Sequence, residues 1–583
     1  MADIYVSEEI TEFEEISFVE EPEARQANSD NVSTILEEET TGIDYQSKLS
    51  WFAQAFLRSY EERLKAKKDL GEQRVKVSNV FGKLASAYER IRNVVEYKGE
   101  HVLRRNAIER ILKRLVWEKE SLRPNIDTAN IAETLTKELI WAKYLPNGAI
   151  LKSKVFDLLN VLNKYLYILE NVGELPKGLR VSGYRNWVWG IASAEIEDLL
   201  DPSNRDLYIK LMFDWFMAYF EWQNPDISEE EKRLQIYLAI HRAYTKSDDS
   251  IMRYHLLLQE IPNWNNAALE DVGFFLNNFS AIFINIEDKL KFPGWLTLYR
   301  RVQKHVAAFE IFRDIAVNKK RNLRKLLLNE KRLETKVKKV CVAKYKLISK
   351  KVRTGIIRSI IYIFITKVLL ALLIEVPYEV IRLGDVRYIP LMINILVPPT
   401  LMWIIGFSIK TPGTKNTHVL IARLDSIVYK PKNQNKQKFS TSRPATSTTL
   451  LKIFGLFYIG VFFLVFGGLT YLLWQINFTI VGILIFFFFL SVVMLFAFRI
   501  RFNSNQLKVD ADDEGFVGHI INYLTLPFLN LGFYLSRGLA KINFFTIIFD
   551  FIIEAPLKTV LEIIEEWTSF IRQKKEEVVE MPE

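Results

Sequence analysis

The chain has 583 residues, enough for two to four domains, and its net charge of +9 averages over segments of opposite sign. The single cysteine, Cys341, excludes an internal disulfide and any cysteine-based zinc or iron–sulfur site within one chain. The six histidines show no metal-binding spacing, and no phosphate-binding loop, nucleophile elbow or kinase motif is present. We therefore expect no catalytic residue, no cofactor and no bound metal, and an enzyme is the least favoured class.

Residues 1–45 carry fourteen acidic side chains and one basic side chain, Arg25. They show neither helical nor strand periodicity. Because like charges repel and few apolar groups are available to form a core, we predict a disordered acidic arm.

Residues 46–318 show apolar side chains at helical spacing, separated by segments rich in Pro, Gly, Asn and Asp. Ser228 followed by Glu231 predicts a helix start with a capping box. No segment alternates long enough to suggest a sheet. We predict an all-helical cytosolic domain with a sub-boundary near 171–185.

Aromatic residues are dense in this region, and two interpretations are open. The favoured one is a packed core. The other is an exposed surface that binds an unknown cytosolic protein, with Trp187, Trp215 and Trp222 as its anchors. The carboxylates Glu195 and Glu197 are interpreted as part of a solvated helix surface.

The segment 101–117 is predicted to be a helix with one strongly basic face. The basic residues are Arg104, Arg105, Arg110, Lys113 and Arg114. A solvated face is favoured over phosphate binding, and no nucleic-acid-binding motif accompanies it. Nucleic acid is therefore not expected as a partner.

The segment 319–355 is predicted to be a basic amphipathic stem helix. Residues 319–353 hold fifteen Lys or Arg against two Glu, and apolar residues including Leu333, Val337, Val340 and Leu347 form a stripe. Such a helix favours anionic lipid by roughly 1 kcal/mol for each basic residue near the surface, although the stripe is also compatible with a coiled coil. The predicted lipid contacts are Lys338, Lys339, Lys344, Lys346, Lys350, Lys351 and Arg353.

Four apolar runs, each about as long as the roughly 20 residues that cross a bilayer, predict two transmembrane hairpins at 356–409 and 450–499. The runs are Ile356–Ile374, Tyr388–Ile409, Ile453–Trp474 and Phe478–Phe498. The fold class is therefore all-α, a polytopic membrane protein with about four spans. The pair Pro398-Pro399 predicts a kink in the second span.

Lys367 lies near the middle of the first span, where a bare charge costs about 2.5–3.5 kcal/mol. It therefore needs a polar partner. Glu375 and Glu379 lie too far along the same helix to reach it, so they are candidates only if they belong to a neighbouring span or chain.

The remaining segments are predicted to be a basic flexible loop at 410–449, disordered after Tyr429, an acidic linker at 500–514, and amphipathic or re-entrant helices with a charged tail at 515–583. Basic residues concentrate before the first span, between the second and third spans, and after the fourth. The positive-inside rule then places both termini in the cytosol, for a protein of the cell (inner) membrane.

The leading functional hypothesis is a non-enzymatic membrane anchor, scaffold or sensor that couples the helical domain to the membrane bundle. The alternative is a transporter or channel subunit for an ion or small solute that uses Lys367 and the kinked second span. The expected partners are a bilayer with anionic lipids, a cytosolic protein and, for a pore, further copies of the chain.

Overall fold

The computed structural model describes residues 48–69, 73–77, 100–121, 127–200, 204–319, 322–430, 436–441, 448–509 and 516–541, together with residues 563, 567, 570, 571 and 574. The predicted acidic arm, residues 510–514 of the acidic linker and most of 542–583 lie outside this part. Contacts divide the chain into two units. The first lies within Met1–Phe309, Lys319–Leu328 and Ser426–Ser442, and the second within Glu310–Asn318, Asn329–Asp425 and Arg443–Glu583.

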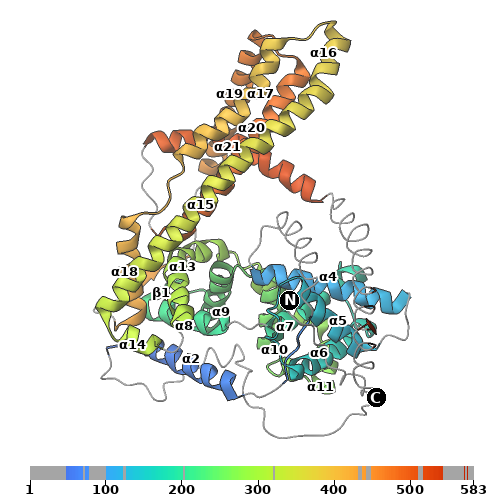
Figure 1. The fold of residues 1–583 in the computed structure, drawn as a ribbon, viewed down its shortest axis with the longest axis vertical. Helices are drawn as coiled ribbons and strands as arrows, with labels where there is room; N and C mark the ends of the chain where they lie inside the picture. Colours follow the sequence, from blue (N-terminus) through green and yellow to red (C-terminus); the bar gives the residue numbers. More distant parts are fainter. Residues whose placement is uncertain are drawn as a thin grey trace, which may run out of the picture. The chain divides into compact units, whose positions relative to one another are not determined.

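The first unit is built almost entirely of helices, and its helix ends fall at the turn-rich segments of the sequence (Figure 1). Ser228 starts α9 by accepting a hydrogen bond from the backbone N–H of Glu231 at 3.2 Å. The elements are α2 (Trp51–Asp69), α4 (Glu100–Ser121), α5 (Thr128–Trp141), α6 (Lys152–Glu170), α7 (Val181–Leu200), α8 (Arg205–Tyr219), β1 (Phe220–Trp222), α9 (Glu229–Ile240), the π-helix His241–Thr245, α10 (Asp249–Glu260), the 3₁₀-helix Trp264–Asn266, α11 (Leu269–Asn277), α12 (Phe279–Leu290), α13 (Trp295–Asn318, which ends in the second unit), α14 (Leu323–Leu327) and β2 (Gln437–Phe439).

Helix α7 is the central helix of this unit. Every residue from Trp187 to Glu197 is buried, so the helix has no solvated face in that stretch. A helix buried all round must be enclosed by others, and α4, α6 and α10 pack against α7. The core therefore depends on one helix whose neighbours come from well-separated parts of the chain.

The described residues also contain a small sheet that the sequence analysis did not predict. Strand β1 pairs in parallel with β2, with Phe220 opposite Gln437 and Trp222 opposite Phe439. Phe439 is 6% exposed and stacks on Trp222 with ring centroids 5.9 Å apart. The expectation of disorder after Tyr429 was therefore wrong for Gln437–Phe439, because one aromatic side chain attaches this polar segment to the core of the unit.

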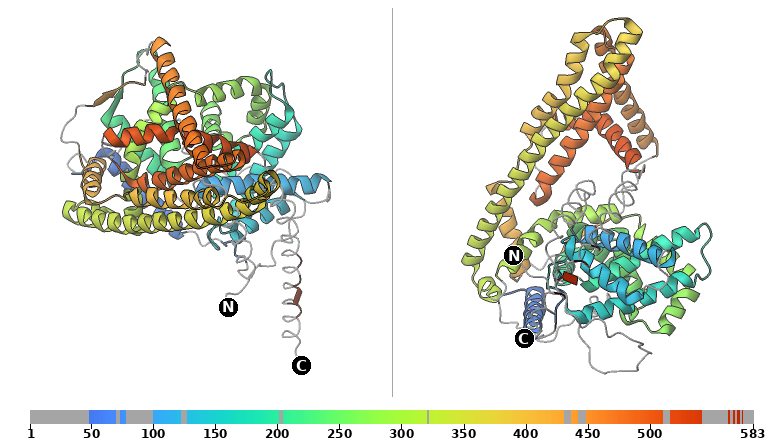
Figure 2. Two further views of the ribbon diagram at one scale, coloured as in Figure 1. Left: turned by 90° about the horizontal axis from the view of Figure 1, so that it is seen from above. Right: turned by 45° about the vertical axis from the view of Figure 1, so that its right-hand side comes forward.

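The second unit contains four helices that are long and apolar enough to cross a membrane: Glu330–Leu383, Tyr388–Ser408, Lys452–Gln475 and Ile480–Leu507. Its elements are α15 (Glu330–Leu370), the π-helix Ala371–Glu375, α16 (Val376–Leu383), α17 (Tyr388–Ser408), α18 (Thr414–Val428, which ends in the first unit), α19 (Thr448–Gln475), α20 (Ile480–Ser504), the 3₁₀-helix Asn505–Leu507 and α21 (Phe516–Lys541). Helices α15, α17 and α20 pack on one another, and α21 packs on α20 (Figures 1 and 2). Two segment predictions change: α18 occupies part of the predicted flexible loop 410–449, and α20 continues into the predicted linker 500–514.

Helix α15 joins the basic stem and the first span without a break, as both views in Figure 2 show. Its buried stem residues are Leu333, Val337, Cys341, Tyr345 and Val352. The predicted apolar stripe is thus present at Leu333 and Val337, whereas Leu347 is 59% exposed. Tyr345 replaces it on the buried face, where its hydroxyl accepts a hydrogen bond from Asn416 of α18 at 2.9 Å.

We predict that Phe439→Ala destabilises the first unit by about 3–5 kcal/mol, because a buried aromatic ring is lost and leaves a cavity. The measurement is denaturant unfolding of the full chain, followed by tryptophan fluorescence. Lys438→Ala, on the exposed side of the same strand, is the control and should change stability by less than about 0.5 kcal/mol. Equal, small effects of the two changes would contradict the assignment of β2 to the core.

Candidate functional site

The strongest candidate site is a buried ion pair inside the second unit, which contains the four long apolar helices. The Lys367 Nζ lies 2.9 Å from the Glu375 Oε1, and the two side chains are 0% and 3% exposed. The ammonium also lies 4.8 Å from the centroid of the Phe489 ring in α20, within cation–π range. Each charge therefore has its main partner within the protein rather than in lipid.

The sequence analysis was wrong to place Glu375 out of reach on the same helix. The two residues are eight apart, slightly more than two turns of an α-helix at about 3.6 residues per turn. Ala371–Glu375 is a π-helix, which bonds i→i+5 and so takes up one additional residue. Glu375 therefore lies where the seventh residue after Lys367 would lie in a regular α-helix, which is on the same face as Lys367. The ion pair consequently forms within one chain.

Asn394 of α17 and Gly482 of α20 complete the cluster. The Asn394 Nδ2 donates to the Glu375 Oε1 at 2.6 Å and to the Gly482 carbonyl at 3.2 Å. Asn394 is 1% exposed, and its Oδ1 has no hydrogen-bond partner among the described residues. Polar groups from three of the four long helices thus meet at one point in the bundle.

Glu379 lies one turn after Glu375 and is also buried, at 4% exposed. Its Oε2 accepts a hydrogen bond from the backbone N–H of Arg387 at 2.9 Å. The Arg387 guanidinium instead donates to the Asn477 carbonyl at 2.6 Å. We refer below to Lys367, Glu375 and Asn394 as the intramembrane cluster, because they lie on helices that are long and apolar enough to cross a membrane.

Sequence reasoning identified Lys367 but missed Asn394 and the pairing with Glu375. A sequence signal for Asn394 was present, because it is a polar residue inside an apolar run, four positions before Pro398. No sequence pattern predicts the π-helix. It is a local backbone adjustment, of a kind that often accompanies functional positions in helices.

The predicted lipid-contacting residues of the stem lie on the solvated side of α15. Six of the seven are exposed: Lys338, Lys339, Lys346, Lys350, Lys351 and Arg353. Lys344 is partly buried and pairs with Asp314 at 2.7 Å, and Lys338 pairs with Glu334 of the preceding turn at 2.7 Å. The exposed charges form a cationic helix face opposite the buried apolar stripe.

The three tryptophans considered as partner anchors are buried. Trp187, Trp215 and Trp222 are 5%, 3% and 6% exposed. Their indole N–H groups donate to Glu287, Ser426 and Asn224, respectively. This arrangement agrees with the packed-core interpretation and leaves little indole surface for a partner.

The basic residues of α4 do not form a free phosphate-binding face. Arg104 is 6% exposed and lies 2.5 Å from Glu197 of α7, which also pairs with Arg205 at 2.6 Å. Arg114 pairs with Glu138 of α5. Glu197, interpreted from the sequence as helix surface, is 2% exposed. These charges hold neighbouring helices together inside the unit.

Glu195 belongs to a second buried network around α7. Lys164 lies 2.7 Å from its Oε1, and the Tyr165 hydroxyl donates to its Oε2 at 2.6 Å. Burial lowers the pKa of the Lys164 ammonium, although Glu195 opposes the shift. Burial and then Glu195 raise the pKa of Tyr165 well above its usual value. Because the polar groups of Lys164, Tyr165 and Glu195 are hydrogen-bonded to one another, we interpret this network as structural.

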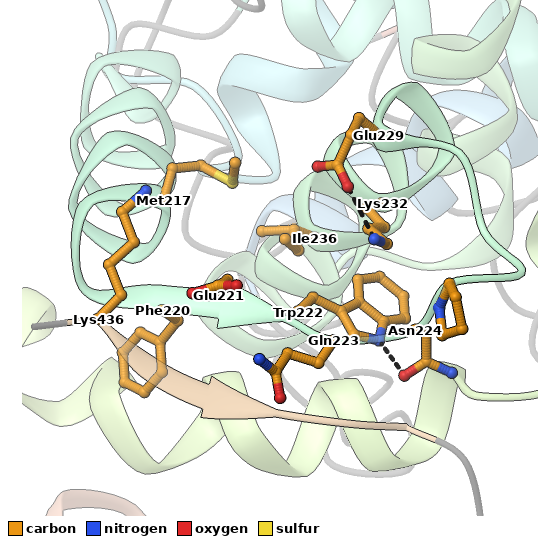
Figure 3. A pocket seen from close by; sticks show the side chains of 11 residues that line it. Met217, Phe220, Glu221, Trp222, Gln223, Asn224, Glu229, Lys232, Ile236 and Lys436 are labelled. Atoms are coloured by element: carbon orange, nitrogen blue, oxygen red, sulfur yellow. Dashed lines mark hydrogen bonds and ion pairs between the residues drawn. The ribbon is translucent and has the colours of Figure 1, made fainter.

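A pocket of about 380 Å³ opens beside β1 in the first unit (Figure 3). Its apolar wall includes Trp222 and Ile236, and its polar groups include Lys232, which lies 2.7 Å from Glu229. Trp222 donates to Asn224 at 2.9 Å. The mixture of apolar wall and paired polar groups does not define one ligand chemistry. Among the described residues, no group of three or more His, Cys, Asp or Glu side chains gathers as a metal site.

We predict that breaking the buried pair with Lys367→Met or Glu375→Gln destabilises the protein by about 3–5 kcal/mol, because the remaining charge is left buried without its partner. The double variant should recover most of the loss. Thermal unfolding in lipid nanodiscs measures this double-mutant cycle. The exposed pair Lys338 and Glu334 provides the matched control, whose coupling should not exceed about 1 kcal/mol. Additive single effects at Lys367 and Glu375 would contradict the pairing.

Comparison with known proteins found no matching family model, no matching curated protein and no matching solved structure.

Proposed function

We propose that the protein is a non-enzymatic membrane anchor and sensor that couples a cytosolic helical unit to a four-helix membrane bundle. The observation that carries the proposal is the continuity of α15, which runs from Glu330 to Leu370 and contains both the basic stem and the first span. A helix without a hinge transmits displacement and rotation along its axis, whereas a flexible linker does not.

The stem has the surface that such a sensor needs. Its exposed Lys and Arg side chains are suited to anionic headgroups, and its buried stripe packs within its own unit. Binding to anionic lipid would add roughly 1 kcal/mol for each basic residue near the surface. The state of the lipid surface would thereby bias the position of α15 in the bundle.

The proposed orientation places both termini in the cytosol. In this topology the four long helices would pair as two hairpins, and the segments that connect them differ strongly in charge. The neutral turn between α19 and α20 would face the opposite side of the membrane from the basic segment between α17 and α19. The protein would then reside in the cell (inner) membrane.

A transporter or channel subunit is the second candidate function. The intramembrane cluster favours it, because ionisable side chains at this depth commonly mark a path for ions or solutes. Helix α19 contributes little to a closed four-helix wall. None of its span window is buried, and a Cβ at Gly460 or Gly467 would meet nothing within 4 Å. Further copies of the chain are therefore the proposed partners for a pore.

For the proposed coupling, we predict that Lys351→Pro separates the stem from the bundle, because proline breaks the helix at an exposed position. Hydrogen exchange is measured in nanodiscs with and without anionic lipid. Anionic lipid should slow hydrogen exchange in residues 330–350 of the wild type and of both variants. In residues 363–383 it should slow exchange only in the wild type and in the control Lys351→Ala. If Lys351→Pro transmits the same effect to 363–383, α15 is not the coupling element.

For the proposed orientation, we predict that a cysteine at Lys350 reacts with a membrane-impermeant maleimide only after permeabilisation. A cysteine at Asp385 should react in intact cells. Both are introduced into a Cys341→Ala background, because Cys341 is the only native cysteine. The reverse labelling pattern would overturn the orientation.

A further inference from the structure

The strand β1 leaves one of its two edges open. The Gln223 N–H donates to the Phe439 carbonyl at 2.8 Å, which fixes the alternation of the parallel ladder between β1 and β2. Because backbone groups alternate between the two edges of a strand, Phe220 and Trp222 direct theirs away from β2. The Phe220 N–H is bonded to the Phe216 carbonyl. The Phe220 carbonyl and both backbone groups of Trp222 have no hydrogen bond in the described part of the chain.

This open edge borders the pocket of about 380 Å³ described above. All three residues of β1 line the pocket and none of the three residues of β2 does, so the pocket lies on the side of β1 away from β2 (Figure 3). Met217 of α8 and Ile236 of α9 supply apolar surface. Pockets for small molecules have volumes of about 300–1,000 Å³. Because unpaired backbone groups are rare in protein interiors, the edge and the pocket together indicate a place for a ligand.

Two side chains of opposite charge at the pocket have no ion pair among the described residues. They are Glu221 and Lys436, and both are exposed. The remaining charged residues of the pocket, Glu229 and Lys232, pair with each other at 2.7 Å. Glu221 lies opposite Lys438 in the sheet, two residues after Lys436. Strand spacings of about 3.3 Å along the chain and about 4.8 Å between strands place the α-carbons of Glu221 and Lys436 about 8 Å apart.

We propose that this pocket binds a free α-amino acid with an apolar side chain. The carboxylate of the ligand accepts a hydrogen bond from the Trp222 N–H and pairs with Lys436. Its ammonium donates to the open carbonyl groups of β1 and pairs with Glu221. Its side chain packs against the apolar surface from α8 and α9. Each polar group that the chain leaves without a partner thereby receives one of complementary kind.

The same groups disfavour other classes of ligand. Inorganic phosphate or a fatty acid brings no cation for Glu221 and no donor for the open carbonyl groups. A metal cation alone brings no acceptor for the Trp222 N–H. An uncharged peptide strand matches the backbone edge but leaves Glu221 and Lys436 unpaired. This inference goes beyond the anchor proposal, because it names a soluble ligand for the helical unit. Binding is measured directly, so it can succeed or fail independently of that function.

The test is calorimetric titration of the full chain in nanodiscs with L-leucine, L-methionine and L-phenylalanine, each added separately. We expect saturable binding of about one molecule per chain for at least one of them. That amino acid should also raise the Tm, because a ligand stabilises the state that binds it. Glu221→Gln and Lys436→Gln should each weaken binding about tenfold, since each removes a charge-assisted hydrogen bond. Lys438→Gln, which changes an exposed lysine outside the pocket, is the control and should leave binding unchanged.

Absence of saturable binding of all three amino acids to the wild type would overturn the proposal. Equal binding by Glu221→Gln and Lys436→Gln would also overturn it, because the ligand would then lie elsewhere. N-acetyl-leucine N-methylamide has the peptide groups without either charge. If it binds as tightly as L-leucine, the edge accepts a peptide strand instead of an amino acid. Should the two variants fail to fold, the wild type decides: equal affinity for L-leucine, hexanoate and hexylamine would overturn the proposal.

Discussion

A charge buried among apolar side chains must be neutralised by a partner within the protein, and the unit that holds the four long apolar helices depends on this constraint. Lys367 would be costly in a lone apolar helix. It becomes tolerable because the π-helix at Ala371–Glu375 turns a carboxylate of the same chain toward it. Asn394 and Gly482 then tie that carboxylate to α17 and α20. The ion pair consequently specifies how the helices α15, α17 and α20 are arranged, beyond what apolar packing alone would require.

The same constraint operates in the helical unit with a different outcome. Around α7, the carboxylates of Glu195 and Glu197 are buried and each is satisfied by partners from other helices. Networks in which every member is satisfied specify one arrangement of a core. The intramembrane cluster retains one unused buried acceptor, the Asn394 Oδ1. This difference separates a structural network from a candidate binding site.

Much of the architecture follows from local sequence properties. Apolar runs of membrane length, helical periodicity and turn-forming residues predicted the four long helices and most helix ends, because these signals depend on neighbours in the chain. The strand Gln437–Phe439 escaped prediction because its pairing partner is more than 200 residues away. The prediction that Leu347 lies on the buried face of α15 was wrong. The apolar pattern allowed Leu347 or Tyr345 on that face, and in the structure Tyr345 lies there, hydrogen-bonded to Asn416 of α18.

Local composition and periodicity are enough to locate the apolar helices, to show how charge is distributed between their connections, and to show that Lys367 requires a partner. The identity of that partner, Glu375, follows from the three-dimensional fold. The π-helix takes up one additional residue, which changes the side chains that face each other beyond it. No periodicity in the sequence predicts this change. Burial was also decided by the fold: Glu195, Glu197 and the three tryptophans lie inside because helices distant in sequence enclose them. Composition can suggest a charged or aromatic face, but long-range packing determines whether solvent reaches it.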